Sequence, residues 1–486
     1  MSDFVEPVAA YFDEFDIDEF PGYAGRRRKA AFTLTMLWGA TLILHLVSWG
    51  SWLIWAAAFV LSSHALRLIL AQPIAPPSPL PSVQPQSGAL SDNSTFQLSA
   101  SESSAVGSTD ESAAWQAWPY VSILVAAKNE ESVITKLVAA LCSLDYPSCR
   151  YDLWIIDDNS TDRTPQVLSQ LSQQYPQLHM VRRAAGATGG KSGALNEVWP
   201  HTQGEVIAVF DADAQVPKDL LRRVVPYFEQ SRVGAVQVRK AIANAGTNFW
   251  TRGQQAEMAL DSYFQQQRIA IGGIGELRGN GQFVRREAVE HCGGWNEETI
   301  TDDLDLTMRL QLRGWDIQFC LHPAVREEGV TRAVALWHQR NRWAEGGYQR
   351  YLDYWRLIAQ NRMSPIKSFD LFVFWLMQYG LPTVALPDLL LAVARNRMPV
   401  FAPLTSMAFS LSLLGMFVGI RRTQKQPLWP SLVQTLRGFV YMFHWLMVIS
   451  TMAMRLSVRQ KRLRWVKTTH LGLEDELPLD VSGEMP

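Results

Sequence analysis

Residues 206–213 read Val-Ile-Ala-Val-Phe-Asp-Ala-Asp, an apolar run that ends in two carboxylates separated by one residue. A short apolar run bounded by polar residues is typical of a buried strand in an α/β sheet. Because side chains alternate along an extended strand, Asp211 and Asp213 are expected to project to the same side. Two converging carboxylates repel each other unless a cation joins them, and Mg²⁺ or Mn²⁺ that also bridges a nucleotide diphosphate would remove the repulsion. The stretch therefore predicts a strand end that carries a ligand site.

The sequence around this stretch alternates between short β-rich runs and helical patterns. Three further β-rich runs precede it at residues 121–127, 153–157 and 179–182, and helical patterns lie at roughly 131–144, 164–175 and 191–199. This alternation predicts an α/β fold with a mostly parallel sheet covered by helices, in a globular region expected at residues 119–361. Open sheets of this kind bind ligands at the carboxyl ends of their strands, so polar residues that follow the strands are site candidates.

Polar residues follow the first two strands. The first strand breaks into Lys128-Asn129-Glu130-Glu131, where Glu130 is placed to meet a nucleobase or ribose donor, although many α/β strands end in Asn-Glu. The second strand ends in Asp157-Asp158-Asn159. An alternative interpretation of the second turn is that Ser160 or Thr161 caps the helix that follows.

A glycine-rich turn opens the third helical pattern, with the sequence Gly189-Gly190-Lys191-Ser192. Its spacing is not that of a Walker loop, because Gly186 lies three residues before Gly189. A helix N-terminus with a lysine nevertheless suits an anionic phosphate, so Lys191 is predicted to contact a diphosphate.

The acidic motif Thr301-Asp302-Asp303 opens a helical stretch at residues 304–313. A carboxylate here is placed to accept a proton from an acceptor hydroxyl during attack. The alternative is that these acidic residues only favour the helix N-terminus, a role that Asp305 fits better than Asp303.

The last motif, Gln339-Arg340-Asn341-Arg342-Trp343, lies in a helix-like stretch. Gln339, Arg342 and Trp343 are spaced i, i+3, i+4 and share one face, so an aromatic plate could stack on a sugar while an arginine steadies a leaving diphosphate. The alternative is an interfacial helix from about residue 333, anchored by basic and aromatic side chains.

Apolar segments on both sides place this chemistry at a membrane surface. An acidic tail at residues 1–30 ends in a basic cluster at 26–29, and an apolar pair of segments at 31–71 predicts a transmembrane hairpin that begins and ends in the cytoplasm. A disordered linker rich in Pro and Ser is expected at residues 72–118.

A second apolar region is expected at residues 366–456, before a basic and then polar tail at 457–486. It holds three apolar runs, at 371–394, 400–420 and 433–454, and the first is interrupted by Gly380, Pro382, Pro387 and Asp388. Basic residues at both ends of the third run break the usual positive-inside arrangement, so one run is expected to be re-entrant or interfacial.

Net charge and cysteine spacing argue against a nucleic-acid-binding protein and against a zinc or disulfide framework. The formal net charge of −1 gives no sign of nucleic-acid binding, which needs a basic face. Four cysteines show neither a CxxC pair nor zinc-ligand spacing, which indicates reduced thiols in the cytosol.

The motifs in this order resemble those of the membrane-embedded family 2 glycosyltransferases, which include the cellulose, chitin and hyaluronan synthases. The resemblance covers roughly Val121 to Trp343 and is specific as a combined pattern. It implies a Rossmann-like GT-A nucleotide-sugar domain with flanking transmembrane helices, and direct displacement at the anomeric carbon with inversion.

The resemblance also implies a role for each motif residue. Glu130 and Asp158 would bind the uridine and Lys191 the diphosphate, while Asp211 and Asp213 would serve the ribose and an Mg²⁺ or Mn²⁺ ion. Asp303 would be the general base, with Asp302 in place of the family's Glu. Gln339, Arg342 and Trp343 would form the acceptor and diphosphate wall.

Acceptor choice separates the members of this family. The acidic N-terminus and compact membrane part are more similar to the cyanobacterial members that transfer glucose from UDP-glucose to diacylglycerol. This implies an integral protein of a plasma or thylakoid membrane with a cytoplasmic catalytic domain. Two alternatives remain: a processive β-glycan synthase, and an inactive membrane-bound nucleotide-sugar sensor. Galactose instead of glucose is also left open.

Overall fold

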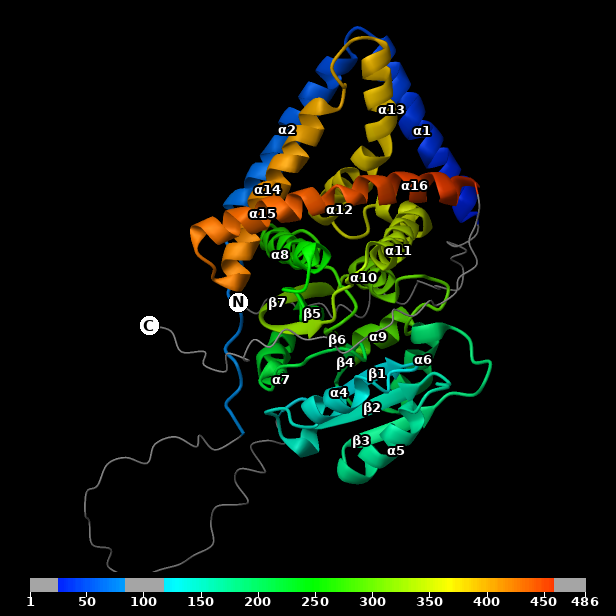
Figure 1. Cartoon of the computed structure of the whole chain (residues 1–486), viewed down its shortest axis with the longest axis vertical. Helices are drawn as coiled ribbons and strands as arrows, with labels where there is room; N and C mark the ends of the chain where they lie inside the picture. The colour runs from blue at the N-terminus through cyan, green and yellow to red at the C-terminus, as the bar shows by residue number, and fades with distance from the viewer. Residues whose placement is uncertain (1–24, 84–117, 459–486) are drawn as a thin grey trace, which may run out of the picture.

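The computed structural model describes residues 25–83 and 118–458 (Figure 1). The acidic part of the N-terminal tail, most of the expected linker and the C-terminal tail lie outside the described residues. Two layers follow each other along the long axis of the molecule, a sheet domain and a layer of long helices.

The sheet domain contains a seven-stranded sheet in the order β3-β2-β1-β4-β6-β5-β7. Its strands are β1 (Val121–Ala127), β2 (Tyr151–Asp157), β3 (Leu178–Arg182), β4 (Val206–Phe210), β5 (Val233–Ile242), β6 (Gln282–Arg285) and β7 (Asp316–Glu327). All neighbours are parallel except β6, which is antiparallel to both β4 and β5. The predicted α/β fold with a mostly parallel sheet is confirmed, and the half formed by β5, β6 and β7 was not predicted.

Helices cover both faces of the sheet, because successive strand residues point to opposite sides. One apolar core joins Ile123 and Val125 of β1 to α4 (Ile134–Leu141), α5 (Thr164–Gln174) and α7 (Leu220–Val224). The opposite core joins Leu124 to α6 (Gly190–Val198), α9 (Arg286–Cys292) and α10 (Asp302–Leu312). Val125 of β1 pairs with Phe210 of β4 and Ala127 with Asp157 of β2, so the motifs that follow these strands emerge at one edge.

Among the described residues, five helical stretches are long and apolar enough to cross a membrane. They are α1 (Arg26–Leu46), α2 (Gly50–Leu70), α12 with α13 (Pro365–Trp375 and Leu381–Ala394), α14 (Ala402–Gln424), and α15 with α16 (Leu428–Met442 and His444–Val458). A π-helical turn at Leu376–Gly380 separates α12 from α13, at the Gly380 that interrupts the first apolar run.

The long helices take two orientations. Helices α1, α2, α13 and α14 rise to a common apex, whereas α15 and α16 run crosswise at their base, next to the sheet domain (Figure 1). One of the three apolar runs was expected to be re-entrant or interfacial. The third run, which forms most of α15 and α16, is the one whose orientation differs from that of the helices at the apex. Helices α8 (Phe249–Ala270) and α11 (Ala333–Ala359) lie between this base and the sheet.

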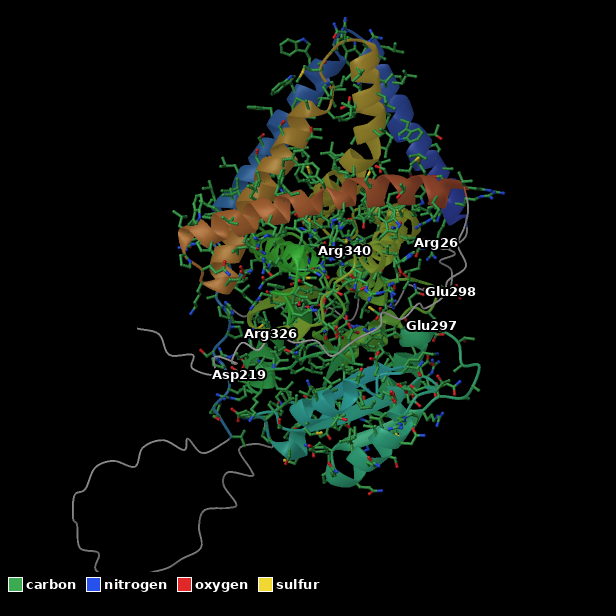
Figure 2. All side chains as sticks on the ribbon, in the orientation of Figure 1. Arg26, Asp219, Glu297, Glu298, Arg326 and Arg340 are labelled. Carbon is green, nitrogen blue, oxygen red and sulfur yellow. The ribbon has the colours of Figure 1, made fainter. Side chains whose placement is uncertain are left out.

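Buried polar pairs hold the long helices in place. Arg26, at the foot of α1 (Figure 2), has its Nη2 2.6 Å from Oδ2 of Asp353 on α11, and both side chains are buried. Within the helical layer, Nε2 of His45 on α1 lies 2.7 Å from Oδ1 of Asp388 on α13. Helix α1 is therefore joined to α11, beside the sheet domain, by a buried ion pair as well as by apolar contacts.

Candidate functional site

A cavity of about 700 Å³ extends from the carboxyl edge of the sheet into the layer of long helices. Eight of the nine predicted site residues line it: Glu130, Lys191, Asp211, Asp213, Asp303, Gln339, Arg342 and Trp343. They come from parts of the chain more than 200 residues apart, so the fold brings together what the motif order only suggested.

Asp158 is the predicted residue that does not line this cavity. Its Oδ1 accepts a hydrogen bond from Nη1 of Arg183 at 2.7 Å, and its Oδ2 accepts one from Nζ of Lys128 at 3.1 Å. A uridine contact by Asp158 stays a prediction, and a ligand donor would have to share this carboxylate with two cations.

The loops after β1 and β2 are tied to each other. Asn129 lies in the left-handed region with φ of 56°, and its N–H donates to Oγ of Ser160 at 2.8 Å. The N–H of Thr161 in turn donates to Oδ1 of Asn129 at 2.7 Å. The alternative that Ser160 or Thr161 caps the next helix is wrong, because α5 begins at Thr164 and Arg163 precedes it. These polar residues instead shape the turn that carries Glu130.

Lys191 lies in the first turn of α6, directly beside the carboxylate of Asp211. Gly189 precedes the helix with φ of 80°, a left-handed conformation that glycine adopts at little cost. Nζ of Lys191 lies 2.6 Å from Oδ1 of Asp211. Burial opposes the charge of the ammonium, but Asp211, Asp302 and Asp303 outweigh it and raise the pKa of Lys191. The lysine is therefore a fixed cation among carboxylates.

Asp213 is partly buried, like Asp211, and is bonded to the backbone that follows β7. Its Oδ2 accepts a hydrogen bond from the N–H of Glu328 at 2.9 Å. Burial, and then the charges of Asp211 and Glu327, raise the pKa of Asp213 to about 7. The carboxylates of Asp211, Asp213 and Glu327 are thus close enough for their negative charges to oppose one another's ionisation. A cation bound among them would stabilise the site.

The described residues hold no group of three His, Cys, Asp or Glu side chains poised as a complete metal cage. Mg²⁺ commonly takes only one or two protein carboxylates and completes its shell with substrate phosphates and water. Asp211 and Asp213 fit that second kind of site, in which the diphosphate of a nucleotide sugar supplies further ligands.

Asp303 lies in the first turn of α10 beside Asp302, whose Oδ2 has no hydrogen-bond partner among the described residues. Burial, and then the charge of Asp302, raise the pKa of Asp303 to about 6. Asp305 differs, because its carboxylate accepts hydrogen bonds from Arg309 at 2.7 Å and from Tyr354 at 2.8 Å. Asp305 therefore has a structural role, while Asp303 faces the cavity.

The wall opposite the sheet is formed by α11. Lys240 holds its Nζ 5.2 Å from the centre of the Trp343 ring, and Cζ of Arg340 lies 4.1 Å from the same centre. Burial lowers the pKa of Arg342, and the charge of Asp211 opposes that shift. Arg342 thus reaches the same charged end of the cavity as the Asp211 carboxylate.

Several contacts of the α11 wall were missed by the sequence motifs. Arg340 donates through Nη1 to Oε1 of Gln339 at 2.8 Å and through Nη2 to Oε2 of Glu257 at 2.5 Å (Figure 2). Trp445 of α16 donates to the same Glu257 at 2.8 Å. Arg340 occupies one of the two x positions of the Gln-x-x-Arg-Trp pattern and Glu257 belongs to no motif, so no local signal marks the pair.

Comparisons with known proteins agree on one family. Residues 119–346 match the family model described as glycosyltransferase like family 2. The chain is 56% identical over 456 residues to the β-monoglucosyldiacylglycerol synthase of a Nostoc species, covering 93% of this chain and 90% of that protein. It is 55% identical over 478 residues to the synthase of the same name from a Synechocystis species, covering 97% and 94%.

Among solved structures, the chain resembles the mannosyltransferase PcManGT from Pyrobaculum calidifontis, determined in complex with GDP-Man and Mn²⁺. The TM-score is 0.51 at 18% sequence identity, over 86% of this chain and 99% of that one. At this identity the likeness concerns the fold alone. The predicted GT-A fold with flanking apolar helices is confirmed.

Proposed function

The chain belongs to the family of the β-monoglucosyldiacylglycerol synthases, and on this premise we propose that it transfers glucose from UDP-glucose to 1,2-diacylglycerol at a membrane surface. The product would be a β-glucosyl glycolipid. One observation carries the proposal: a single cavity joins the carboxylates of the sheet to the interior of the apolar helices.

The two ends of this cavity differ in chemical character. Lys191, Asp211 and Asp303 line the sheet end, and this charged surface suits a nucleotide diphosphate sugar. Leu61 of α2 and Leu411 of α14 line the helical end, which suits acyl chains and offers little to the hydroxyls of a growing glycan. Because diacylglycerol stays in the bilayer, a site that opens towards apolar helices favours a lipid acceptor over a polymer.

We assign the chemical step to Asp303. Its carboxylate would take the proton of the glycerol hydroxyl while the hydroxyl oxygen attacks C1 of the glucose. The bond from C1 to the glycerol oxygen forms as the bond from C1 to the diphosphate oxygen breaks, and UDP leaves with the electron pair. Inversion at C1 converts the α-linked donor into a β-glucoside.

The other residues would bind and orient the substrates. Lys191 and Arg342 would hold the diphosphate, Gln339 and Trp343 the sugar and acceptor, and Glu130 with Asp158 the uridine side. Asp213 and Asp211 would hold a divalent cation, Mg²⁺ or Mn²⁺, which when bound would neutralise charge on the diphosphate.

The orientation of the helices suggests a membrane arrangement. Helices α1, α2, α13 and α14 would cross the bilayer, with α15 and α16 lying in its cytoplasmic interface. The basic cluster at residues 26–29 would then lie at the cytoplasmic foot of α1, on the side of the catalytic domain.

The test incubates membranes containing the chain with labelled UDP-glucose and dioleoylglycerol, then separates extracted lipid from insoluble material. We expect the label to appear in the lipid fraction, in a glycolipid from which a β-glucosidase releases labelled glucose. Excess chelator should abolish formation of this product, and added Mg²⁺ or Mn²⁺ should restore it. Labelled UDP-galactose in parallel decides the sugar. Label in insoluble polymer would contradict the lipid acceptor, and unchanged turnover in chelator would contradict the cation.

A further inference from the structure

Between the charged and apolar ends of the cavity lies a group of polar side chains that we call the polar collar. It consists of His64 on α2, Arg268 on α8, Glu276 and Arg278 before β6, Arg350 on α11 and Asp370 on α12. All of them except Glu276 line the cavity, and Glu276 is itself fully buried. Four helices from both layers therefore contribute to one polar surface.

The collar begins beside the proposed base. A Cβ atom placed on Gly279, the residue after Arg278, would lie 3.5 Å from Oδ2 of Asp303. Nη2 of Arg278 lies 2.7 Å from Oε2 of Glu276, whose Oε1 lies 2.9 Å from Nη1 of Arg350. The collar thus touches the place where a glycerol hydroxyl would react.

The collar continues from there towards the membrane helices. Nη1 of Arg268 lies 3.5 Å from Oε2 of Glu276, and its Nε donates to Oδ2 of Asp370 at 2.9 Å. Oδ1 of Asp370 in turn lies 3.5 Å from Nε2 of His64. The polar surface therefore ends on α2, where Leu61 and Leu68 continue the cavity as an apolar wall.

Several buried nitrogens of the collar have no hydrogen-bond partner among the described residues. Nη1 of Arg350 and Nε2 of His64 face the carboxylates of Glu276 and Asp370, and Nδ1 of His64 is a ring nitrogen; the other two are the arginine donors Nη2 of Arg268 and Nε of Arg350. Each arginine is 2% exposed, so bulk water does not supply one. Because an arginine stays protonated, these two nitrogens are permanent donors, and leaving them unpartnered in a buried site is unfavourable.

The charges of the collar decide what kind of group fits these donors. Arg268, Arg278 and Arg350 are balanced by Glu276, Asp370 and Asp261, the last of which accepts from Arg278 at 2.9 Å. A balanced site gains little from another anion, so the missing partner is a neutral acceptor. Ester carbonyl oxygens are such acceptors, and diacylglycerol carries two of them next to its free hydroxyl.

We propose that Arg268 and Arg350 hold the ester carbonyl oxygens of the acceptor, which makes the protein selective for diacyl over dialkyl glycerols. The two guanidinium groups flank one carboxylate, Glu276, so one arginine would meet each of the two ester groups of the glycerol. The acyl chains would then follow the apolar wall, with the free hydroxyl turned towards Asp303. The inference rests on the lipid-transferring function proposed above.

The test compares two acceptors that differ only in the atoms assigned to the collar. The full chain in mixed micelles receives UDP-glucose with either 1,2-dioleoylglycerol or its diether, 1,2-di-O-oleylglycerol, at the same mole fraction. We expect kcat/KM to be at least about tenfold lower with the diether, the effect of losing a hydrogen bond to a charged group. Equal use of both lipids would overturn the inference and leave the proposed function standing. Transfer to neither lipid would overturn the proposed function itself.

A pair of variants assigns the preference to the collar. Arg268→Lys keeps a cation facing Asp370 but lacks the second terminal nitrogen, so we expect it to lose the part of the diester preference that Arg268 supplies and to keep the part that Arg350 supplies. Arg252→Lys is the matched control, because Arg252 lies exposed on the same helix and should keep the wild-type preference. A full preference in Arg268→Lys would overturn the role of Arg268. If Arg268→Lys no longer binds UDP, the wild-type comparison of the two lipids decides the proposal.

Discussion

Asp303 and Asp305 lie two positions apart on α10 and have opposite surroundings. Asp305 is bonded to Arg309 and Tyr354, whereas Asp303 lines the cavity beside Asp302. The same acidic helix start therefore supplies one structural carboxylate and one that is available for chemistry. This difference lets the two roles be separated by matched substitutions.

We expect Asp303→Asn to lower kcat by about 10³-fold, within the range that a general base contributes, with UDP-glucose affinity nearly unchanged. Asp305→Asn should instead lower the thermal midpoint, because it weakens a buried pair with Arg309, while the folded fraction keeps its turnover. Turnover and UDP titrations on both variants check the assignment. Preserved turnover in Asp303→Asn together with lost UDP binding would reject Asp303 as the base.

The environment of Asp303 also predicts a pH dependence. Because burial and Asp302 raise its pKa to about 6, the carboxylate is protonated below that pH and ionised above it. A base must be ionised to accept a proton, so kcat/KM should rise with pH through about 6 and then level off. An acidic limb that survives unchanged in Asp303→Asn would assign the titration to another group.

At the scale of elements, α11 reaches the acidic turn because it carries a glycine where the two meet. A Cβ atom on Gly346 would lie 2.9 Å from Cβ of Thr301, and closer still to Oγ1 of Thr301. Thr301 directly precedes Asp302 and Asp303, so the packing of α11 places the proposed base relative to the Gln339–Trp343 wall.

Gly346→Ala should therefore destabilise the protein by about 1–3 kcal/mol, the usual cost of overpacking, and lower kcat by displacing the acidic turn. Gly39→Ala on α1 is the control, because a Cβ there would meet nothing within 4 Å. Thermal unfolding and turnover of the two detergent-solubilised variants give the comparison. If the two variants had the same thermal midpoint and the same turnover, the contact of α11 with Thr301 would have no role in positioning Asp303.

At the scale of the whole molecule, the crosswise position of α15 and α16 accounts for the basic clusters at both ends of the third apolar run. Arg421 and Arg422 end α14, and Arg455 lies in the last turn of α16. In the proposed arrangement, a helix that lies along the base would keep both clusters on the same side without crossing the bilayer. Arg455 also reaches Glu345 on α11 at 3.0 Å, which ties this helix to the catalytic layer.

This arrangement predicts which residues face each side of the membrane. In intact bacterial spheroplasts, a cysteine placed at Arg397, exposed in the loop at the apex, should react with an impermeant maleimide. The exposed thiol of Cys149 on the sheet domain should react only after lysis. Variants that retain one of these thiols and lack the other cysteines allow the comparison. Labelling of both thiols from outside would contradict the proposed orientation.

The first strands, the motifs at their ends and the apolar character of the flanking helices were all predictable from the amino-acid sequence. These features are local, because strand and helix periodicity and the residues that end an element are visible within a short window. The motif order resembles that of the family 2 glycosyltransferases, and this resemblance implied a GT-A domain next to a membrane.

Only the tertiary structure decided that Asp158 faces Arg183 and Lys128 outside the cavity lining, and that Arg340 meets Glu257. It also decided that the third apolar run lies crosswise, and that Arg268 and Arg350 meet at Glu276 between the charged and apolar ends of the cavity. Each of these contacts joins residues far apart in the chain through the packing of several elements. A local pattern contains no information about which distant side chain will balance a buried charge.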